Sequence, residues 1–412
     1  MTKFKYFLSF CIFLILVVLF FALCPKTKLL DKKTEVIFWT VQLSTFSDYM
    51  NNVISEFEKQ HPDIKIKWID VPYAEAEKRV LASLLSNNVP DLINITSDFN
   101  ITLASKGALA KLVDGKELYA PLILRAVTYD NDVVGIPFYA TSAITVYNKS
   151  LINAFDVKEL PQSYLKMFNL IQNSPKISNK YLFMPTLTEN DTFYKILNKY
   201  ELASSDKINT DETIEIFSIL KNLYTSEKIP KESITQTHRE VLEKYSAGQI
   251  AFLQVGANFL NIIKENSLDT YNNTDILPQL YGSNKAYDFS LMTLAVPLKS
   301  KHQKEAFLFA SFLTNEVNQL EFSKLTGVLP CNKFTLNDEY FKKIVKNDLI
   351  EKSRLIGAKQ LLSPISYPIQ TAKHKELIDY INKTTEQILL ENKEISELLN
   401  NLQKNWRILE AN

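Results

Sequence analysis

Hydrophobic and polar positions near the start of the chain change from a helical to an alternating pattern within a few residues. The apolar side chains of the first segment recur at the spacing of one helix face: Phe46, Tyr49, Met50, Val53 and Phe57. Pro62 biases His61 away from helical dihedral angles and therefore ends the helix. The alternating run "IKIKWI" at 64–69 then predicts a half-buried strand. With the strand candidate "VIFWT" at 36–40, the order is strand, helix, strand, which predicts a parallel pair.

The same alternation of elements continues to about residue 107. A second helix is predicted by a further apolar face, made by Ala76, Val80, Leu81, Leu84 and Leu85. A third strand begins at Asp91, and a short helix after it ends at Gly107, a residue suited to a left-handed helix cap. This order predicts an open α/β sheet, in which ligands bind at the carboxyl ends of the strands.

The remainder of the chain is predicted in less detail. Residues 133–151 read as two extended segments on either side of a proline and a tyrosine. Residues 152–285 are expected to be mostly helical, with strand-like interruptions at 180–190 and 248–259. A strand, a turn and a helix that ends at "TGVLPCN" follow from residue 288, and one or two amphipathic helices are expected between 371 and 410.

Length and charge bound the domain count and the class of partner. The 412 residues suffice for two domains. The formal charge is +1 and the sequence contains no basic stripe of the kind that nucleic-acid binding needs, so a nucleic-acid partner is not expected. Cys331 is the one cysteine of the chain outside the N-terminal segment, so an internal disulfide is not expected there.

The N-terminal segment indicates export. Two lysines precede an uncharged run of about 18 residues from Phe7 to Cys24, which is just long enough to span a bilayer. Cys24 is a lipidation candidate, although Leu23 stands where lipoprotein signals usually carry a small side chain. Lipidation, an uncleaved anchor and simple cleavage all remain open, and each leaves the chain from Lys26 onward outside the cytoplasm.

Signatures of catalysis and of metal binding are absent from the sequence. The four histidines are scattered, without "HExxH" or paired cysteines, so we expect no metal site, no cofactor and no catalytic residue. Nucleophile-elbow and phosphate-loop motifs are missing as well. The spacing of carboxylates neither supports nor excludes a glycosidase pair.

An ordered series of segments resembles one family. "VIFWT", "EFEKQHPDIKIK", "LLSNNVPDLINITSD", "KGALAKL", "GIPFYATSAITVYNKSL", "YSAGQIAFLQVGANF" and "EAFLFASFLTNEVNQLEFSKLTGVLP" follow each other as in extracytoplasmic solute-binding proteins of ABC importers. The resemblance is to the sugar-binding group that includes maltose-, multiple-sugar- and glycerol-3-phosphate-binding proteins. It covers residues 35 to 335 well and the C-terminal helices loosely.

The resemblance implies a periplasmic-binding-protein fold, with two α/β lobes joined by hinge crossings and a ligand cleft between them. After a signal peptide or anchor at 1–25, the first lobe would comprise 33–138 and 293–335, and the second 142–288 and 336–412. The lobes would close on the ligand by a population shift.

The implied function is capture of a mono- or oligosaccharide and its delivery to the transmembrane subunits of an ABC permease. The protein would be a monomer, tethered to the outer side of the cytoplasmic membrane through its N-terminus. Glycerol-3-phosphate or another small polar solute remains an alternative ligand. A sensor input without a transport role remains an alternative function.

Candidate ligand contacts combine flat aromatic faces for a sugar ring with polar groups for its hydroxyls. Those in the first lobe follow strand ends or lie at the first crossing: Trp39, Thr40, Gln42, Ser97, Asp98 and Tyr139. Those in the second lobe are Thr188, Glu189, Gly256, Asn258, Tyr287, Asp288 and Phe289. Asn258 stands where the family usually has tryptophan, which removes a stacking platform and favours a smaller or more polar ligand.

Overall fold

The structure is a computed structural model that describes residues 33–86, 88–344, 346, 348–362 and 373–411. The predicted signal or anchor segment and the lipidation candidate Cys24 lie outside the described residues. In the described ranges, no helix combines the length and the apolar character needed to cross a bilayer.

The first three elements confirm the predicted parallel unit. Strand β1 (Thr34–Val41) pairs in parallel with β2 (Ile64–Val71), and α2 (Ser47–Gln60) connects them. The helix ends where Pro62 required, because His61 leaves helical geometry while its backbone N–H still reaches the Phe57 carbonyl at 2.9 Å. The apolar stripe of α2 is buried against the sheet.

The chain forms one long mixed sheet with the strand order β2-β1-β3-β10-β6-β8-β7. β9 and β11 pair with β6 outside this path. The remaining strands are β3 (Leu92–Thr96), β4 (Thr128–Tyr129), β5 (Asp132–Val133), β6 (Ile136–Asn148), β7 (Tyr181–Phe183), β8 (Ile250–Gly256), β9 (Thr274–Pro278), β10 (Phe289–Ala295) and β11 (Leu329–Pro330).

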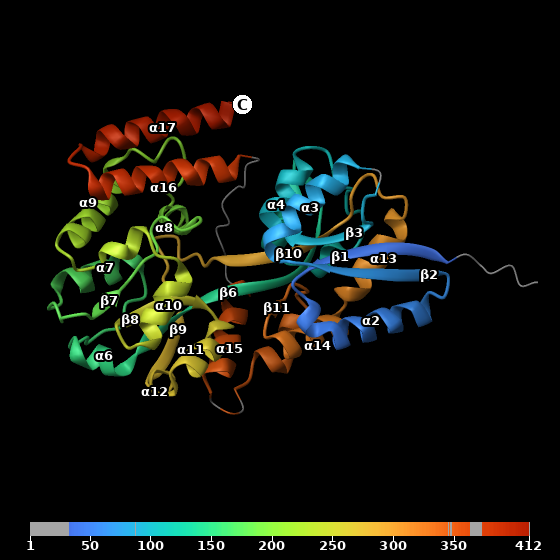
Figure 1. Ribbon diagram of the computed structural model, residues 1–412, viewed down its shortest axis with the longest axis horizontal. Helices are drawn as coiled ribbons and strands as arrows, with labels where there is room; N and C mark the ends of the chain where they lie inside the picture. Colours follow the sequence, from blue (N-terminus) through green and yellow to red (C-terminus); the bar gives the residue numbers. More distant parts are fainter. Residues whose placement is uncertain (1–32, 87, 345, 347, 363–372, 412) are drawn as a thin grey trace, which may run out of the picture.

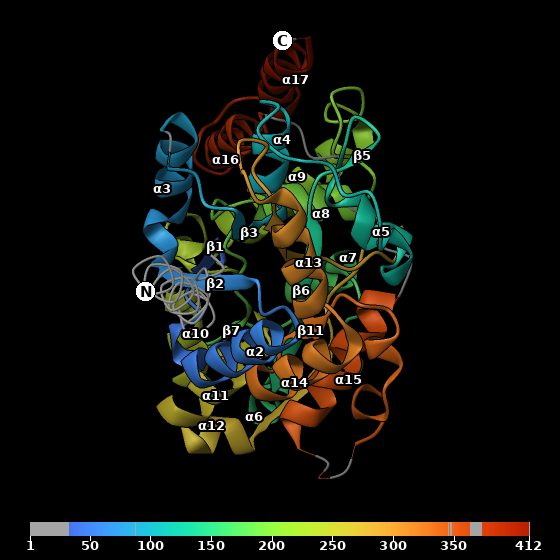
Figure 2. The same cartoon turned by 90° about the vertical axis from the view of Figure 1, so that its right-hand side faces the viewer.

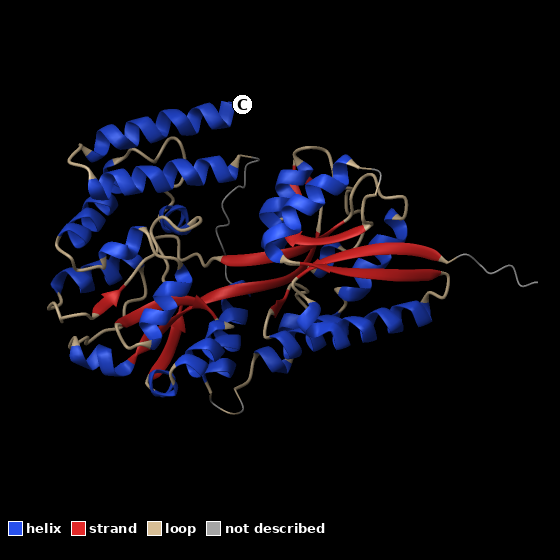
Figure 3. Cartoon of the chain, in the orientation of Figure 1, coloured by secondary structure: helices blue, strands red, loops and turns tan. Residues whose placement is uncertain are grey.

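Helices surround this sheet at both ends (Figure 3). They are α3 (Tyr73–Leu85), α4 (Ser97–Ala104), α5 (Pro121–Arg125), α6 (Lys149–Ala154), α7 (Tyr164–Asn173), α8 (Thr192–Lys199), α9 (Asp211–Thr225), α10 (His238–Ser246), α11 (Phe259–Asn266), α12 (Leu268–Asn272), α13 (Gln303–Leu313), α14 (Glu316–Thr326), α15 (Leu349–Leu362), α16 (His374–Leu390) and α17 (Ile395–Ala411). As predicted, Gly107 follows α4 in the left-handed conformation, with φ of 65°.

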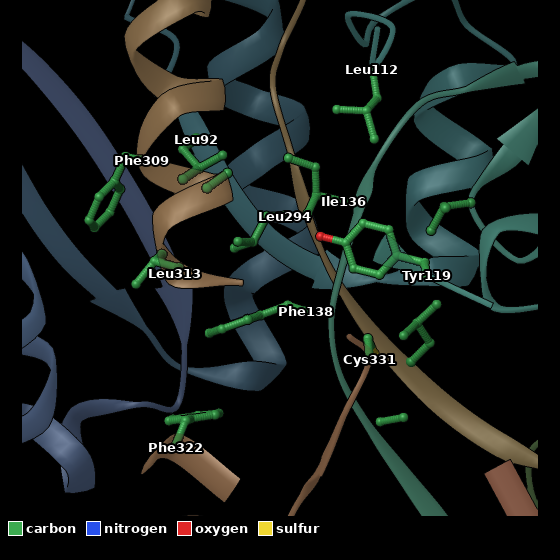
Figure 4. Close-up of a cluster of buried hydrophobic side chains, with 14 of the residues drawn as sticks. Leu92, Leu112, Tyr119, Ile136, Phe138, Leu294, Phe309, Leu313, Phe322 and Cys331 are labelled. Carbon is green, nitrogen blue, oxygen red and sulfur yellow. The ribbon is translucent and has the colours of Figure 1, made fainter. Parts of the chain in front are cut away.

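Two lobes lie side by side, and β6 and β10 run between them (Figure 1). The first lobe carries β1–β3, α2–α5, α13 and α14. Its core joins residues distant in sequence, such as Phe38 on β1, Phe138 on β6 and Phe309 on α13. Phe138 stacks on Phe322 with ring centroids 5.3 Å apart, and Cys331 is buried beside them (Figure 4).

The second lobe carries β7–β9, α6–α12 and the C-terminal helices. Its largest core contains Phe193, Phe217 and Phe252, and the apolar faces of α16 and α17 pack against it through residues such as Ile388 and Trp406. Two views agree that α17 lies outside α16, at the edge of the molecule (Figure 2). The expectation of one or two amphipathic C-terminal helices resolves to two.

Two expectations about elements were wrong, and two further elements were not expected. Residues 136–148 form one continuous strand, because both ends of β6 find pairing partners and its Pro137 lies near one end. The single late helix is two, α13 and α14, since Asn315 caps α14 by accepting a hydrogen bond from the Asn318 N–H. β9 and α15 were not predicted as separate elements.

The division into lobes at the predicted boundaries stays a prediction. The packing bears on one of them. Leu336 and Phe341, which the prediction assigns to the second lobe, are buried in the same core as Phe38. By packing, the first lobe therefore extends beyond residue 335, the predicted boundary, to at least Phe341.

Candidate functional site

A cavity of about 610 Å³ opens where the crossing strands meet the second lobe. Its walls come from β6 and β10, from the segment between β7 and α8, from the end of β8, and from the first residues of α10 and α11. Aromatic rings and polar groups alternate around it: Tyr164, Phe183, Phe259 and Phe289 with Ser142, Thr186, Asn190, Asp191, Lys195, His238 and Gln254.

Five of the predicted site residues line this cavity: Glu189, Gly256, Asn258, Asp288 and Phe289. They come from three separate stretches of the chain, which the sheet brings together. Thr188 lies beside them, but its hydroxyl donates to the Ile234 carbonyl at 2.7 Å, outside the lining. Tyr287 is half-buried and is also outside the lining.

Asp288 is held from behind by a buried lysine. The Lys199 side chain is 0% exposed, and its Nζ lies 2.9 Å from Asp288 Oδ2. The same ammonium donates to Gln279 Oε1 at 3.0 Å and to the Ala286 carbonyl at 3.1 Å. Burial lowers the pKa of Lys199, and the charge of Asp288 opposes that shift. The lysine is thus fully coordinated by the protein, and it fixes the Asp288 carboxylate at the cavity wall.

An amide network joins this wall to the crossing. Gln279 Nε2 donates to the Asp288 carbonyl at 2.8 Å, and the Asp288 N–H donates back to Gln279 Oε1 at 2.8 Å. Gln360 of α15 donates to Ser142 Oγ at 2.7 Å and to the Ala143 carbonyl at 2.8 Å, and accepts from the Gln279 N–H at 2.8 Å. Buried amides with all these partners specify one arrangement of the crossing.

Glu189 and His238 form the opposite wall. Glu189 Oε2 accepts from the backbone N–H of His238 at 2.6 Å, at the first residue of α10. The His238 ring packs edge-on against Phe259, with centroids 5.3 Å apart. Burial lowers the pKa of His238, and the charge of Glu189 opposes the shift. The lowered pKa favours the neutral form of the His238 imidazole.

Gly256 and Asn258 leave the cavity open at the end of β8. A Cβ atom at Gly256 would lie 2.5 Å from Asn258 Oδ1, so the glycine gives this amide its room. Asn258 makes no side-chain cap bond to α11. The aromatic surface that the Asn258 position does not provide comes from its neighbour Phe259.

A second, smaller hollow of about 230 Å³ lies in the first lobe at the carboxyl ends of β1 and β3. We call it the first-lobe depression and define it by its lining residues: Val41, Tyr73, Ala74, Ala76, Glu77, Ile95, Thr96, Phe99 and Met292. Met292 lies two residues after Ser290 on β10, and Ser290 lines the cavity. The depression and the cavity therefore share one face of a crossing strand.

The three predicted residues at the end of β1 lie outside both hollows. Trp39 packs among the apolar residues behind the depression, where its buried indole N–H has no hydrogen-bond partner among the described residues. Thr40 is fully buried, donates to Asp70 Oδ1 at 2.6 Å and accepts from Trp68 Nε1 at 2.7 Å. Gln42 is exposed in the left-handed conformation, with φ of 53°.

Asp98 lies at the edge of the depression, in the first turn of α4 after the buried Ser97. Solvent reaches it, yet desolvation raises the pKa of its carboxyl group. The charges of His374 and Lys195 lower that pKa, and the charge of Asp191 raises it. The charges of His374, Asp191 and Lys195 that act on Asp98 all belong to the second lobe.

Tyr139 lies at the crossing, but its ring faces the first-lobe core. It packs 5.5 Å from the Phe322 ring, and burial together with the charge of Asp70 raises its pKa. It lines neither hollow. Tyr139 therefore shares the environment of its neighbour Phe138.

Most of the cavity lining was not predicted from sequence. Tyr164, Asp191, Lys195, His238 and Gln279 lie on helices or in loops without a local motif, and only the fold brings them together. Tyr73 is different, because it follows directly on the end of β2 and is 61% exposed. The search of strand ends that selected Trp39 could have found it.

No group of three His, Cys, Asp or Glu side chains in the described part of the chain is arranged to hold a metal ion.

Comparison with known proteins gives consistent results. The profile of the family described as bacterial extracellular solute-binding protein matches residues 52–347. An uncharacterised ABC transporter extracellular-binding protein of Pyrococcus horikoshii is 25% identical over 71% of this chain and 72% of its own length. The multiple sugar-binding protein of Streptococcus mutans is 22% identical over 71% and 74%.

A solved structure from Synechococcus sp. MITs9220, provisionally named an oligosaccharide periplasmic-binding protein, is 26% identical. The match has a TM-score of 0.80 and covers 91% of this chain and 99% of that one. The two-lobed fold expected from the sequence is thereby confirmed.

Proposed function

Because this chain belongs to the family of bacterial extracellular solute-binding proteins, we propose that it captures a sugar between its lobes and delivers it to an ABC permease. Members of the family bind solutes and do not transform them, and they act outside the cytoplasm. The chain is thus an extracytoplasmic binding protein and not an enzyme. The sugar, the permease and a monomeric state are our proposals.

The observation that carries the proposal is the chemistry of the cavity. Aromatic faces such as Phe259 cover the apolar face of a sugar ring, while carboxylates and amides such as Glu189 and Asn258 pair with its hydroxyls. The volume of about 610 Å³ has room for at least one ring. The names of the Streptococcus and Synechococcus proteins, a multiple sugar-binding and an oligosaccharide-binding protein, support the same ligand class.

The charge balance of the cavity argues against a phosphate ligand. Three carboxylates line it, on Glu189, Asp191 and Asp288. Lys195 is its one lysine, 2.9 Å from Asp191, and none of the described lining residues is an arginine. A phosphate group would therefore meet net negative charge, which disfavours glycerol-3-phosphate.

A thermal-shift screen of residues 26–412 tests the ligand class. Mono-, di- and trisaccharides, polyols and glycerol phosphates would each be added at a hundredfold excess over the expected Kd. A ligand that binds only the folded state then adds about 2.7 kcal/mol of stability. We expect a shift with one or more neutral sugars, and a reduced shift in Asp288→Asn. A shift with glycerol phosphate alone would contradict the sugar proposal and leave the binding-protein fold intact.

We also propose that the N-terminal segment tethers the protein to the membrane, by lipid on Cys24 or as an uncleaved helix. Cells expressing the chain would be fed a clickable palmitate and fractionated, with Cys24→Ala as the matched variant. Label at Cys24 with membrane association indicates a lipoprotein. Membrane association without label indicates the helix. Release of the unlabelled wild-type chain would contradict tethering.

A further inference from the structure

The two hollows of the cleft differ in chemistry. Seven of the nine residues that line the first-lobe depression are apolar or aromatic, and the exceptions are Thr96 and Glu77. The Thr96 hydroxyl already accepts from the Phe99 N–H at 3.3 Å, where it caps α4. The depression therefore offers a ligand apolar contact and few hydrogen bonds, in contrast to the carboxylates and amides of the cavity.

One ligand can reach both hollows. Ser290 in the cavity and Met292 in the depression lie on the same side of β10, because Leu291 between them is buried in the first-lobe core. Residues two apart on a strand are separated by roughly 7 Å. Thr141 of β6 pairs with Ser290 and also lines the cavity, so the two crossing strands form a continuous floor.

In the part of the chain that the structure describes, the second-lobe groups that act at the edge of the depression are charged side chains. Asp98 stands one residue before Phe99 of the depression, and the second-lobe groups that act on its carboxylate are His374, Asp191 and Lys195. Charged side chains of this kind would lose hydration against an apolar hollow. An apolar part of the ligand is the occupant that satisfies both the hollow and these charges.

We propose that the ligand is an amphipathic sugar: a glycoside whose sugar ring lies in the cavity and whose apolar aglycone fills the first-lobe depression. The inference rests on the proposed function, since it adds a second subsite to the same cleft. A volume of about 230 Å³ accommodates a phenyl ring or a six-carbon chain. Burial of these groups against Met292, Val41 and the Tyr73 ring supplies the affinity that the polar cavity alone does not.

The experiment compares matched glycosides by calorimetry and thermal shift. Methyl, hexyl and phenyl glycosides of glucose, galactose, N-acetylglucosamine and maltose would be titrated into residues 26–412. We expect the hexyl or phenyl form of the sugar that binds to bind at least tenfold more tightly than its methyl form. The readout is the ratio of the dissociation constants of the methyl and the hexyl or phenyl forms. Both forms carry the same sugar, so a change in sugar binding affects both constants and cancels in the ratio.

Substitutions in the depression assign the ratio to this hollow. Met292→Gln keeps the length of the side chain and makes it polar, and Tyr73→Ser removes an exposed ring. Each should reduce the methyl-to-hexyl ratio to below about threefold. Met292→Leu is the matched control, since it keeps an apolar side chain, and it should retain most of the ratio.

The outcomes separate this inference from the proposed function. Equal affinity of methyl and hexyl forms in the wild type, or a ratio that survives both Met292→Gln and Tyr73→Ser, would overturn the aglycone subsite and leave the sugar receptor standing. If no glycoside of any length binds, the sugar proposal fails and the subsite fails with it.

Discussion

At the residue scale, the cleft depends on a buried lysine that is not among the residues lining the cavity. Lys199 is wholly buried, and three oxygens around its Nζ replace the water it loses. A buried ion pair adds little net stability compared with apolar residues, but removal of one partner leaves the other charge uncompensated. Asp288 is the partner here, and it lines the cavity. The stability of the lobe and the geometry of the site are therefore coupled through one ion pair.

Replacement of Lys199 by methionine tests this coupling. We expect Lys199→Met to reduce the free energy of unfolding by about 3 kcal/mol, because Asp288 and Gln279 lose their shared donor. Sugar affinity should fall as well, since the carboxylate is no longer held. Urea denaturation and calorimetry measure both.

The control for that variant is Lys176→Met, which removes an exposed lysine 3.9 Å from Glu227. Its effect on unfolding should stay within about 0.5 kcal/mol. A loss in Lys199→Met no larger than in this control would show that the buried pair is dispensable.

His238 gives a second prediction at this scale, on pH dependence. Burial lowers its pKa, so the folded state protonates this ring at lower pH than the unfolded chain, which does so near pH 6.5. Stability from this group is therefore lost as the pH falls from above about 6.5 toward the folded pKa. Glu189→Gln should lower the pKa of His238 further, because the carboxylate favours the imidazolium.

Histidine side-chain NMR between pH 4 and 8 measures that shift, with His238→Asn used to assign the signal among four histidines. A pKa above 6.5, or a rise of the pKa in Glu189→Gln, would contradict the environment described for α10.

At the scale of elements, one close approach fixes the wall that carries Lys199. Gly282, in the loop between β9 and β10, passes so near the end of α8 that a Cβ atom would lie 2.2 Å from the Lys199 carbonyl oxygen. The nearest atoms belong to the backbone of Lys199, which cannot move aside as the end of a flexible side chain can. The absence of a side chain at Gly282 therefore lets the loop deliver Gln279 and Asp288 to the lysine.

Gly282→Ala should destabilise the protein by about 2 kcal/mol and weaken sugar binding, because α8 and the loop must separate. Gly107→Ala is a useful comparison. A Cβ atom added at Gly107 would meet no atom within 4 Å, but the residue has φ of 65°, so this substitution introduces backbone strain without a steric clash. We expect it to cost about 1 kcal/mol without changing affinity. Denaturant curves measure the stability of both variants, and calorimetry measures their affinity for the sugar. An unchanged sugar affinity in Gly282→Ala would show that this close approach does not position the cavity wall.

At the scale of the molecule, two crossing strands and one helix connect the lobes. The first part of β6 pairs with β10, and its second part pairs with β8 along one edge and with β9 along the other, so the sheet continues through the connection. Gln360 of α15 bonds to β6 at Ser142 and Ala143, beside the cavity. We expect the lobes to rotate about this connection while the polar network keeps the cavity wall intact.

We predict that the sugar found in the screen closes the lobes and reduces the radius of gyration. Small-angle scattering of residues 26–412 with and without that sugar measures the change, and a sugar without thermal shift serves as the control. Closure follows from stronger binding to the closed form, where the cavity and the depression contact the ligand together. An unchanged radius at saturating ligand would exclude closure.

The sequence by itself determined the elements whose signals are local. The stripe of α2, its end at Pro62 and the alternation of β2 follow from side-chain periodicity and proline geometry, and so does the left-handed Gly107. The order of these elements predicted an open α/β sheet, and the resemblance of the ordered segments to solute-binding proteins implied the two lobes. Five candidate site residues of the second lobe, chosen mainly from segments that resemble the family, line the cavity: Glu189, Gly256, Asn258, Asp288 and Phe289.

Only the tertiary structure decided which side chains share a hollow. Trp39 and Thr40 stand at a strand end as expected. Trp39 nevertheless packs behind the depression, and the Thr40 hydroxyl forms hydrogen bonds with Asp70 and Trp68. Conversely, Lys199 and Gln279 are 80 residues apart and meet at one carboxylate. Periodicity shows which face of an element is buried, but contacts between distant segments depend on how those faces pack, and this chain's cleft is built almost entirely from such contacts.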